Sequence, residues 1–149
     1  RIDVTGTLAF EAALDAGSGH LSIHSTGAQT YTAAGDLTTS GSGSVDVQAA
    51  SIAMDDGAGI NADANIRLVA AGALSLGSLA TSADVSLSAS SISDSGTSDT
   101  DVSADELRIV STGTADGEGA GGSGNYLEIS VAKLAADVSG TGAGGLFVS

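Results

Sequence analysis

The chain has 149 residues and carries 18 acidic side chains against four lysines and arginines, a formal net charge of −14 at pH 7. Such a surface repels the phosphates of nucleic acids and of anionic membranes, so both are excluded as partners. There is no cysteine for disulfides or thiol chemistry, and no run of about twenty apolar residues that would insert into a membrane.

Glycine and proline usage favours a continuous backbone ladder with tight corners. The chain contains 22 glycines and no proline. Proline lacks the N–H that an internal strand donates, whereas glycine supplies the positive φ angles of tight turns. The regular recurrence of valine, isoleucine and leucine favours an ordered chain over a disordered one.

One motif recurs eight times along the chain: an aliphatic residue, any residue, and a second aliphatic residue. Successive copies start 19 to 24 residues apart. A repeat this short cannot bury its own apolar face, so neighbouring copies must stack into a shared core. The pattern predicts a parallel β-helix (a β-solenoid) of about seven coils with a period of roughly 20 residues.

The two aliphatic positions of the motif are predicted to form two inward-facing columns, because alternate residues of a strand share a face. The first column comprises Ile2, Leu21, Val45, Ile66, Val85, Leu107, Leu127 and Leu146. The second column comprises Val4, Ile23, Val47, Leu68, Leu87, Ile109, Ile129 and Val148.

Two further aliphatic sites follow the motif in most coils, so each coil is predicted to carry three short strands around a triangular cross-section. One site is filled by Leu8 or Phe10, then by Ile52, Leu74, Ile92 and Leu134. The other is filled by Leu14, Leu37, Ile60, Leu79, Val102 and Val138. Corners rich in glycine, serine and aspartate separate the strands.

Two coils depart from the regular spacing. The second is the longest, which predicts an extra loop near residues 29–35. The sixth carries a glycine-rich stretch at 116–124 where an aliphatic site is expected, and we predict a mobile loop there.

Charged residues at the middle position of the motif test the stacking. Asp46 lies one coil from Arg67, and Arg108 lies one coil from Glu128. Stacked strands are about 4.8 Å apart, so each pair is predicted to form a salt bridge. Exposed pairs of this kind contribute only about 0–1 kcal/mol, so they serve as register checks.

Acidic residues gather in two stretches where weak Ca²⁺ binding is conceivable, because calcium takes several oxygen ligands from a loop. The first stretch comprises Asp94, Asp99, Asp101, Asp105 and Glu106, and the second comprises Asp55, Asp56 and Asp63. Neither matches a known calcium-loop spacing, so solvated acids are the favoured interpretation. We therefore predict no cofactor, with weak Ca²⁺ binding left open.

Other candidate sites have simpler explanations. Residues 119–124 match G-x-G-x-x-G, but a predicted strand follows them instead of the helix that holds a pyrophosphate. His20 and His24 have no third metal ligand nearby. Asp3, Asp46 and Glu128 share a predicted face but lie in separate coils, too far apart for paired-carboxylate catalysis. No catalytic, cofactor or metal residues are predicted, and we expect no enzyme activity.

Residues 1–149 are predicted to form a single β-solenoid segment. Neither end shows the polar capping that a free-standing solenoid needs. We expect the rod to continue at both ends, through more of the same chain or through identical subunits end to end.

Three stretches carry a family resemblance: "HLSIHSTGAQTYTAAGDLTTSGSG", "NIRLVAAGALSLGSLATSA" and "YLEISVAKLAADVSGTGAGG". They resemble the repeats of filamentous-haemagglutinin-type bacterial exoproteins and related giant surface adhesins. The resemblance implies a right-handed β-helix, export to the extracellular space or bacterial cell surface, a rod-like shaft, and a role in attachment or in the extracellular matrix.

The expected function is that of a structural stalk or fibre segment of a secreted bacterial surface adhesin or exoprotein. One alternative is a self-assembling extracellular filament subunit that stacks through its open coil ends. A third is a carbohydrate-binding or carbohydrate-cleaving β-helix, for which host or matrix glycans would be the partners.

Overall fold

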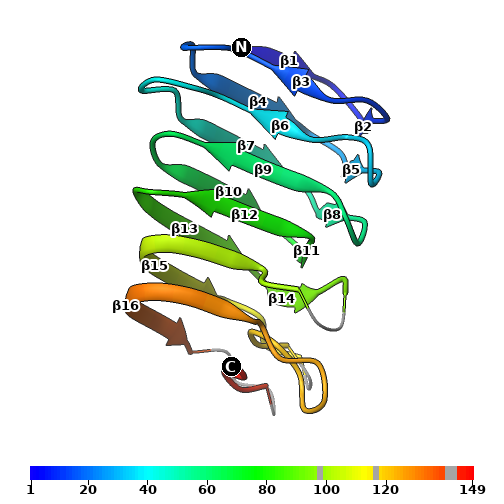
Figure 1. The fold of residues 1–149 in the computed structure, drawn as a ribbon. Helices are drawn as coiled ribbons and strands as arrows, with labels where there is room; N and C mark the ends of the chain where they lie inside the picture. Colours follow the sequence, from blue (N-terminus) through cyan, green and yellow to red (C-terminus); the bar gives the residue numbers. More distant parts are fainter. Residues whose placement is uncertain (97–98, 116–117, 140–143) are drawn as a thin grey trace.

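The computed structural model describes residues 1–96, 99–115, 118–139 and 144–149. It confirms an all-β fold in which parallel sheets form a β-solenoid (Figure 1). The stack has about five regular turns, followed by a longer sixth turn between β15 and β16, so the predicted number of seven coils is only approximate. Within the described ranges, no helix is long and apolar enough to cross a membrane.

Each of the first four turns contributes one short strand to each of three faces, and β13 and β14 belong to the fifth turn. The first face holds β1 (Ile2–Val4), β4 (Leu21–Ser25), β7 (Val45–Ala49), β10 (Ile66–Ala70) and β13 (Asp84–Ala89). The second face is a five-stranded sheet of β2 (Leu8–Phe10), β5 (Gln29–Tyr31), β8 (Ile52–Met54), β11 (Ala73–Leu76) and β14 (Ser91–Asp94). The third face holds β3 (Leu14–Asp15), β6 (Leu37–Thr38), β9 (Gly59–Ala62) and β12 (Ser78–Thr81).

Two long strands join the first and third faces into one sheet of 11 strands. They are β15 (Val102–Ser111) and β16 (Ile129–Val138). Val102 of β15 pairs with Leu79 on the third face, and Leu107 of the same strand pairs with Val85 on the first. These strands therefore pass through a corner that is a loop in the earlier turns.

The two predicted columns are confirmed across the middle of the stack. On the first face, consecutive register partners are Leu21, Val45, Ile66, Val85 and Leu107. The second column runs through Ile23, Val47, Leu68, Leu87 and Ile109. All ten side chains are buried, which is the period-two pattern expected of strands with one face on a core.

The predicted alignment is wrong in the first turn. Ile2 pairs with Ile23 instead of Leu21, and Val4 pairs with Ser25. A slip of two residues leaves every side chain on the same face of the strand, so the apolar pattern does not distinguish the two registers.

The predicted alignment is also wrong in the last turns. Leu107 pairs with Leu134, and Val102 pairs with Ile129, so the motif at 127–129 belongs to the third face. Leu146 forms a bridge with Ala120 on the second face, and Val148 forms one with Leu127. The reason is an unusually long sixth turn, in which register partners are 27 positions apart.

The additional aliphatic sites are largely confirmed. Leu14, Leu37, Ile60, Leu79 and Val102 form one continuous column. Ile52, Leu74 and Ile92 form the other. Two assignments are wrong: Leu134 lies on the first face, as the partner of Leu107, and Val138 pairs with Ser111.

The extra loop predicted near residues 29–35 is confirmed only in part. Gln29–Tyr31 is strand β5, but the corner 32–36 that follows it is longer than the corresponding corner 11–13 of the first turn. The second turn also has a long corner further on, at 39–44 between β6 and β7. Thr39 stabilises this longer corner by donating a hydrogen bond from its hydroxyl to the Gly43 carbonyl, at 2.8 Å.

A buried polar pair interrupts the second-face column. Gln29 takes the place of an aliphatic residue between Leu8 and Ile52. The Tyr31 hydroxyl donates to Gln29 Oε1 at 2.6 Å, and Gln29 Nε2 donates to the Gln48 carbonyl at 3.1 Å. The glutamine is tolerated in the core because both ends of its amide are hydrogen-bonded.

Candidate functional site

One of the two predicted register pairs is confirmed. Arg67 Nη1 lies 2.7 Å from Asp46 Oδ1 across β10 and β7. The pair of Arg108 and Glu128 is wrong, because Arg108 pairs with Ala135. Glu128 lies instead at a corner of the solenoid, beside two other acids.

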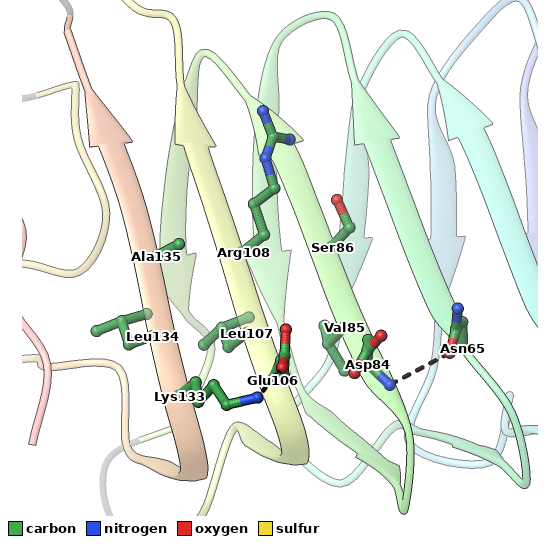
Figure 2. A pocket seen from close by; sticks show the side chains of 10 residues that line it. All are labelled: Asn65, Asp84, Val85, Ser86, Glu106, Leu107, Arg108, Lys133, Leu134 and Ala135. Carbon is green, nitrogen blue, oxygen red and sulfur yellow. Dashed lines mark hydrogen bonds and ion pairs between the residues drawn. The ribbon is translucent and has the colours of Figure 1, made fainter.

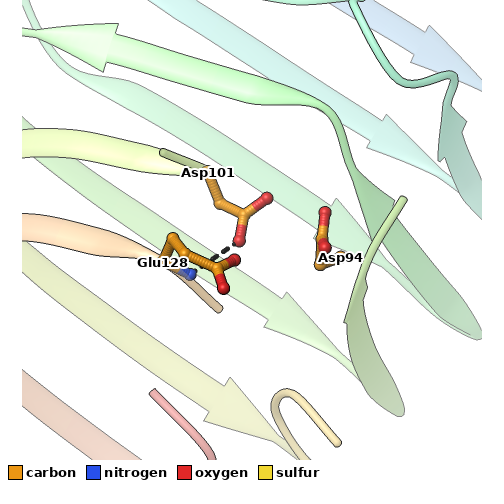
Figure 3. Close-up of side chains that lie close together, drawn as sticks. All are labelled: Asp94, Asp101 and Glu128. Atoms are coloured by element: carbon orange, nitrogen blue, oxygen red, sulfur yellow. Dashed lines mark hydrogen bonds between the residues drawn. The ribbon is translucent and has the colours of Figure 1, made fainter. Parts of the chain in front are cut away.

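Asp94, Asp101 and Glu128 form this acidic cluster (Figure 3). Asp94 is the last residue of β14, Asp101 directly precedes β15, and Glu128 directly precedes β16. One carboxylate oxygen from each residue lies within 4.8 Å of those from the other two. The stacking of the fifth and sixth turns thus brings together residues that are up to 34 positions apart.

Asp94 occupies a position that holds a large uncharged side chain in every earlier turn. Its register partner is Leu76, and the equivalent residues of the turns before are Met54, Tyr31 and Phe10. Asp94 is only 8% exposed, so its carboxylate points into the solenoid. Oδ1 accepts a hydrogen bond from the Gly96 N–H at 2.6 Å. Oδ2 is buried without a hydrogen-bond partner among the described residues.

Asp101 is held by two hydrogen bonds to the next turn. Its Oδ2 accepts a hydrogen bond from the Glu128 N–H at 2.8 Å, and its own N–H donates to the Glu128 carbonyl at 2.8 Å. Burial raises the pKa of Asp101 to about 8, and Asp94 adds to the increase, while the hydrogen bond from Glu128 opposes it. The group therefore favours a proton or a cation at its free oxygen.

Glu128 completes the cluster with a second unsatisfied oxygen. Its Oε2 is buried and, within the described residues, has no hydrogen-bond partner. Burying a carboxylate oxygen without a partner is costly in an interior of low dielectric constant. A proton or a cation held among the three carboxylates would satisfy the two unpartnered oxygens of Asp94 and Glu128.

The basic side chains of the protein do not supply that charge. Arg1 pairs with Asp3, Arg67 with Asp46, and Lys133 with Glu106. Arg108 projects from the outer surface of β15 (Figure 2). Ion pairs within the described part of the chain do not include any of the three clustered acids.

A hollow of about 230 Å³ opens beside the cluster. Asp94 and Asp101 line it together with Asp56 and Asp99, among glycines and serines. It thus unites one acid of the second predicted stretch with three of the first. The remaining acids of those stretches do not line it, and Glu106 instead pairs with Lys133.

A larger hollow of about 550 Å³ lies between β13, β15 and β16 (Figure 2). Two acids and two bases line it, and Lys133 pairs with Glu106 there. Unlike the acidic cluster, it contains no buried polar atom without a partner among the described residues. Its chemistry is therefore less specific than that of the cluster.

The other candidate sites do not assemble in the structure. Ser44 contacts His20 Nδ1, whereas His24 lies 3.8 Å from Asp3. Asp116 and Gly117 of the predicted mobile loop lie outside the described residues. In the rest of that stretch, Ala120 is buried and bridges Ile92. The segment after residues 119–124 leads into β16, so the helix of a dinucleotide site is not there.

Comparison with family models, curated proteins and solved structures finds no significant match for this chain.

Proposed function

We propose that this chain is a structural stalk segment of a secreted bacterial surface adhesin or exoprotein. The observation that carries the proposal is the unbroken register of β4, β7, β10, β13 and β15, in which each aliphatic residue of the first face stacks on the next. The resemblance of the repeats to filamentous-haemagglutinin-type proteins supports the extracellular part of the proposal.

The proposed role as a stiff spacer follows from the direction of the backbone hydrogen bonds between turns. Parallel strands lie across the rod, so the backbone hydrogen bonds between turns run along its axis. Each fully buried leucine, isoleucine or valine adds about 1.5–3 kcal/mol by leaving water. Ladder and core together resist bending, which is what a spacer requires. The net charge of −14 favours solubility of such an extended surface.

Sedimentation velocity and negative-stain electron microscopy over a range of protein concentrations test this role. A stalk segment gives short particles that do not grow into ordered filaments. Uniform filaments that lengthen with concentration would instead establish the self-assembling subunit. Release of reducing sugar from glycans, or saturable binding on a glycan array, would establish the carbohydrate-directed alternative.

The location has its own test. An antiserum raised against the purified chain should label the outside of intact cells of the organism that produces it. Labelling that appears only after the cells are permeabilised would contradict the proposed export.

A further inference from the structure

We propose that the acidic cluster of Asp94, Asp101 and Glu128 is a Ca²⁺ site that fastens the fifth turn of the solenoid to the sixth. This proposal is independent of the stalk function, because it concerns how one corner of the stack is held. It rests on the position of Asp94 in an apolar column and on the two unsatisfied oxygens that share the corner.

The spacing of the oxygens fits one calcium ion. Ca²⁺ binds oxygen at about 2.3–2.6 Å, so two ligands of the same ion are at most about 5 Å apart. The three carboxylates offer oxygens within 4.8 Å of one another. Asp94 Oδ2 and Glu128 Oε2 are the oxygens without another partner, and Asp101 has Oδ1 left after Oδ2 accepts from Glu128.

The chemistry of the ligands also fits calcium. All three are carboxylates, the hard oxygen ligands that Ca²⁺ prefers, and the ion tolerates irregular geometry and variable coordination number. The adjoining hollow leaves room for water ligands and places the exposed Asp99 close by. Mg²⁺ demands a more regular octahedron, which three acids from separate strand ends do not readily provide.

Asp36 shows what the corner looks like without a cluster. It directly precedes β6, as Asp101 precedes β15, and its Oδ1 accepts a hydrogen bond from the Gly59 N–H of the next turn at 2.8 Å. Within the described residues, Asp36 belongs to no group of three acids. A backbone bond to the next turn is therefore a feature of the solenoid itself. The convergence of Asp94 and Glu128 on Asp101 needs a separate explanation.

Calcium at this position has a structural purpose. The sixth turn is the longest, and its second-face position is held by the small residue Ala120, which forms only an isolated bridge to Ile92. β15 and β16 already pair with each other along their length, whereas β14 meets the next turn only through that isolated bridge. One ion bound by Asp94, Asp101 and Glu128 would connect the end of β14 to the starts of β15 and β16.

Isothermal titration calorimetry of CaCl₂ into chelator-treated protein, at physiological ionic strength, tests the proposal. Wild type should bind one ion per chain, and Asp94→Asn and Glu128→Gln should each weaken binding by about tenfold or more. Asp36→Asn is the matched control, because it removes a corner carboxylate of the same solenoid and should bind calcium like wild type. MgCl₂ should give weaker binding than CaCl₂.

Three results would overturn the proposal. They are no saturable binding by wild type, equal binding by Asp94→Asn, and Mg²⁺ affinity equal to that for Ca²⁺. Circular dichroism checks that each variant keeps the β-solenoid. If Asp94→Asn does not fold, Glu128→Gln decides, because Glu128 is only half-buried and lies outside the regular strands.

Discussion

Leu76 and Asp94 are register partners on β11 and β14, and both side chains point into the solenoid. One turn thus places a leucine where the next places an aspartate. The leucine contributes to the core, whereas the aspartate leaves Oδ2 without a partner among the described residues. An aspartate at a position where the preceding turn buries a leucine is unusual in so regular a stack. This replacement is the main reason for proposing Ca²⁺ at the corner formed by Asp94, Asp101 and Glu128.

Asp94→Leu should stabilise the protein in the presence of chelator. The substitution restores the residue of the preceding turn and removes a buried carboxylate, which we expect to raise the free energy of unfolding by about 1–3 kcal/mol. Chemical denaturation in chelator measures the change, and added calcium should no longer stabilise this variant. Destabilisation in chelator would mean that the hydrogen bond from the Gly96 N–H to Oδ1 outweighs the cost of burying Oδ2.

The metal-free protein should lose stability as the pH rises from about 4 to about 8. Burial raises the pKa of Asp101 to about 8 in the folded protein, against about 3.9 in an unfolded chain. Between these values the folded state holds a proton that the unfolded state has released, so raising the pH favours unfolding. Above the folded pKa the loss stops.

Denaturation in chelator at about pH 5, 7 and 9 measures this dependence, and Asp101→Asn should flatten it. Saturating calcium should also reduce the slope, because the ion replaces the proton. A profile in chelator that is the same for wild type and Asp101→Asn would contradict the assignment.

The middle of the alignment was predictable because three features agree there: the motif, its spacing and the additional aliphatic sites. The ends were not, since a two-residue slip at Ile2 preserves the apolar face and the long sixth turn carries the motif at 127–129 onto another face.

The site was only partly predictable. A second apolar-x-apolar pattern runs through Ile52–Met54 and Leu74 to Leu76, and Asp94 breaks it two residues after Ile92. The sequence therefore marks Asp94 as unusual. No comparable sequence pattern marks Glu128, because the position of Glu128 in the stack depends on the length of the sixth turn.

Leu87→Asp should disrupt the stack, since Leu87 is fully buried between Leu68 and Ile109. We expect a cost above about 4 kcal/mol, and about 2–5 kcal/mol for the milder Leu87→Ala. Ser86→Asp is the matched control, because its side chain is on the outer face of the same strand. Thermal melting by circular dichroism measures all three, and similar melting of Leu87→Asp and Ser86→Asp would contradict the register.

Tyr31→Phe should cost about 1–3 kcal/mol, because it leaves Gln29 Oε1 buried without its donor. Adding Gln29→Leu should recover most of that loss, since leucine restores the aliphatic column of the second face. A double-mutant cycle measures the coupling between the two residues. Additive effects would show that the buried pair does not act as a unit.

A crystal structure of the protein grown with calcium tests the account most directly. We expect that structure to show the register of β4, β7, β10, β13 and β15, and one ion at about 2.3–2.6 Å from oxygens of Asp94, Asp101 and Glu128. An intact corner without an ion, in which the three acids share protons instead, would contradict the account.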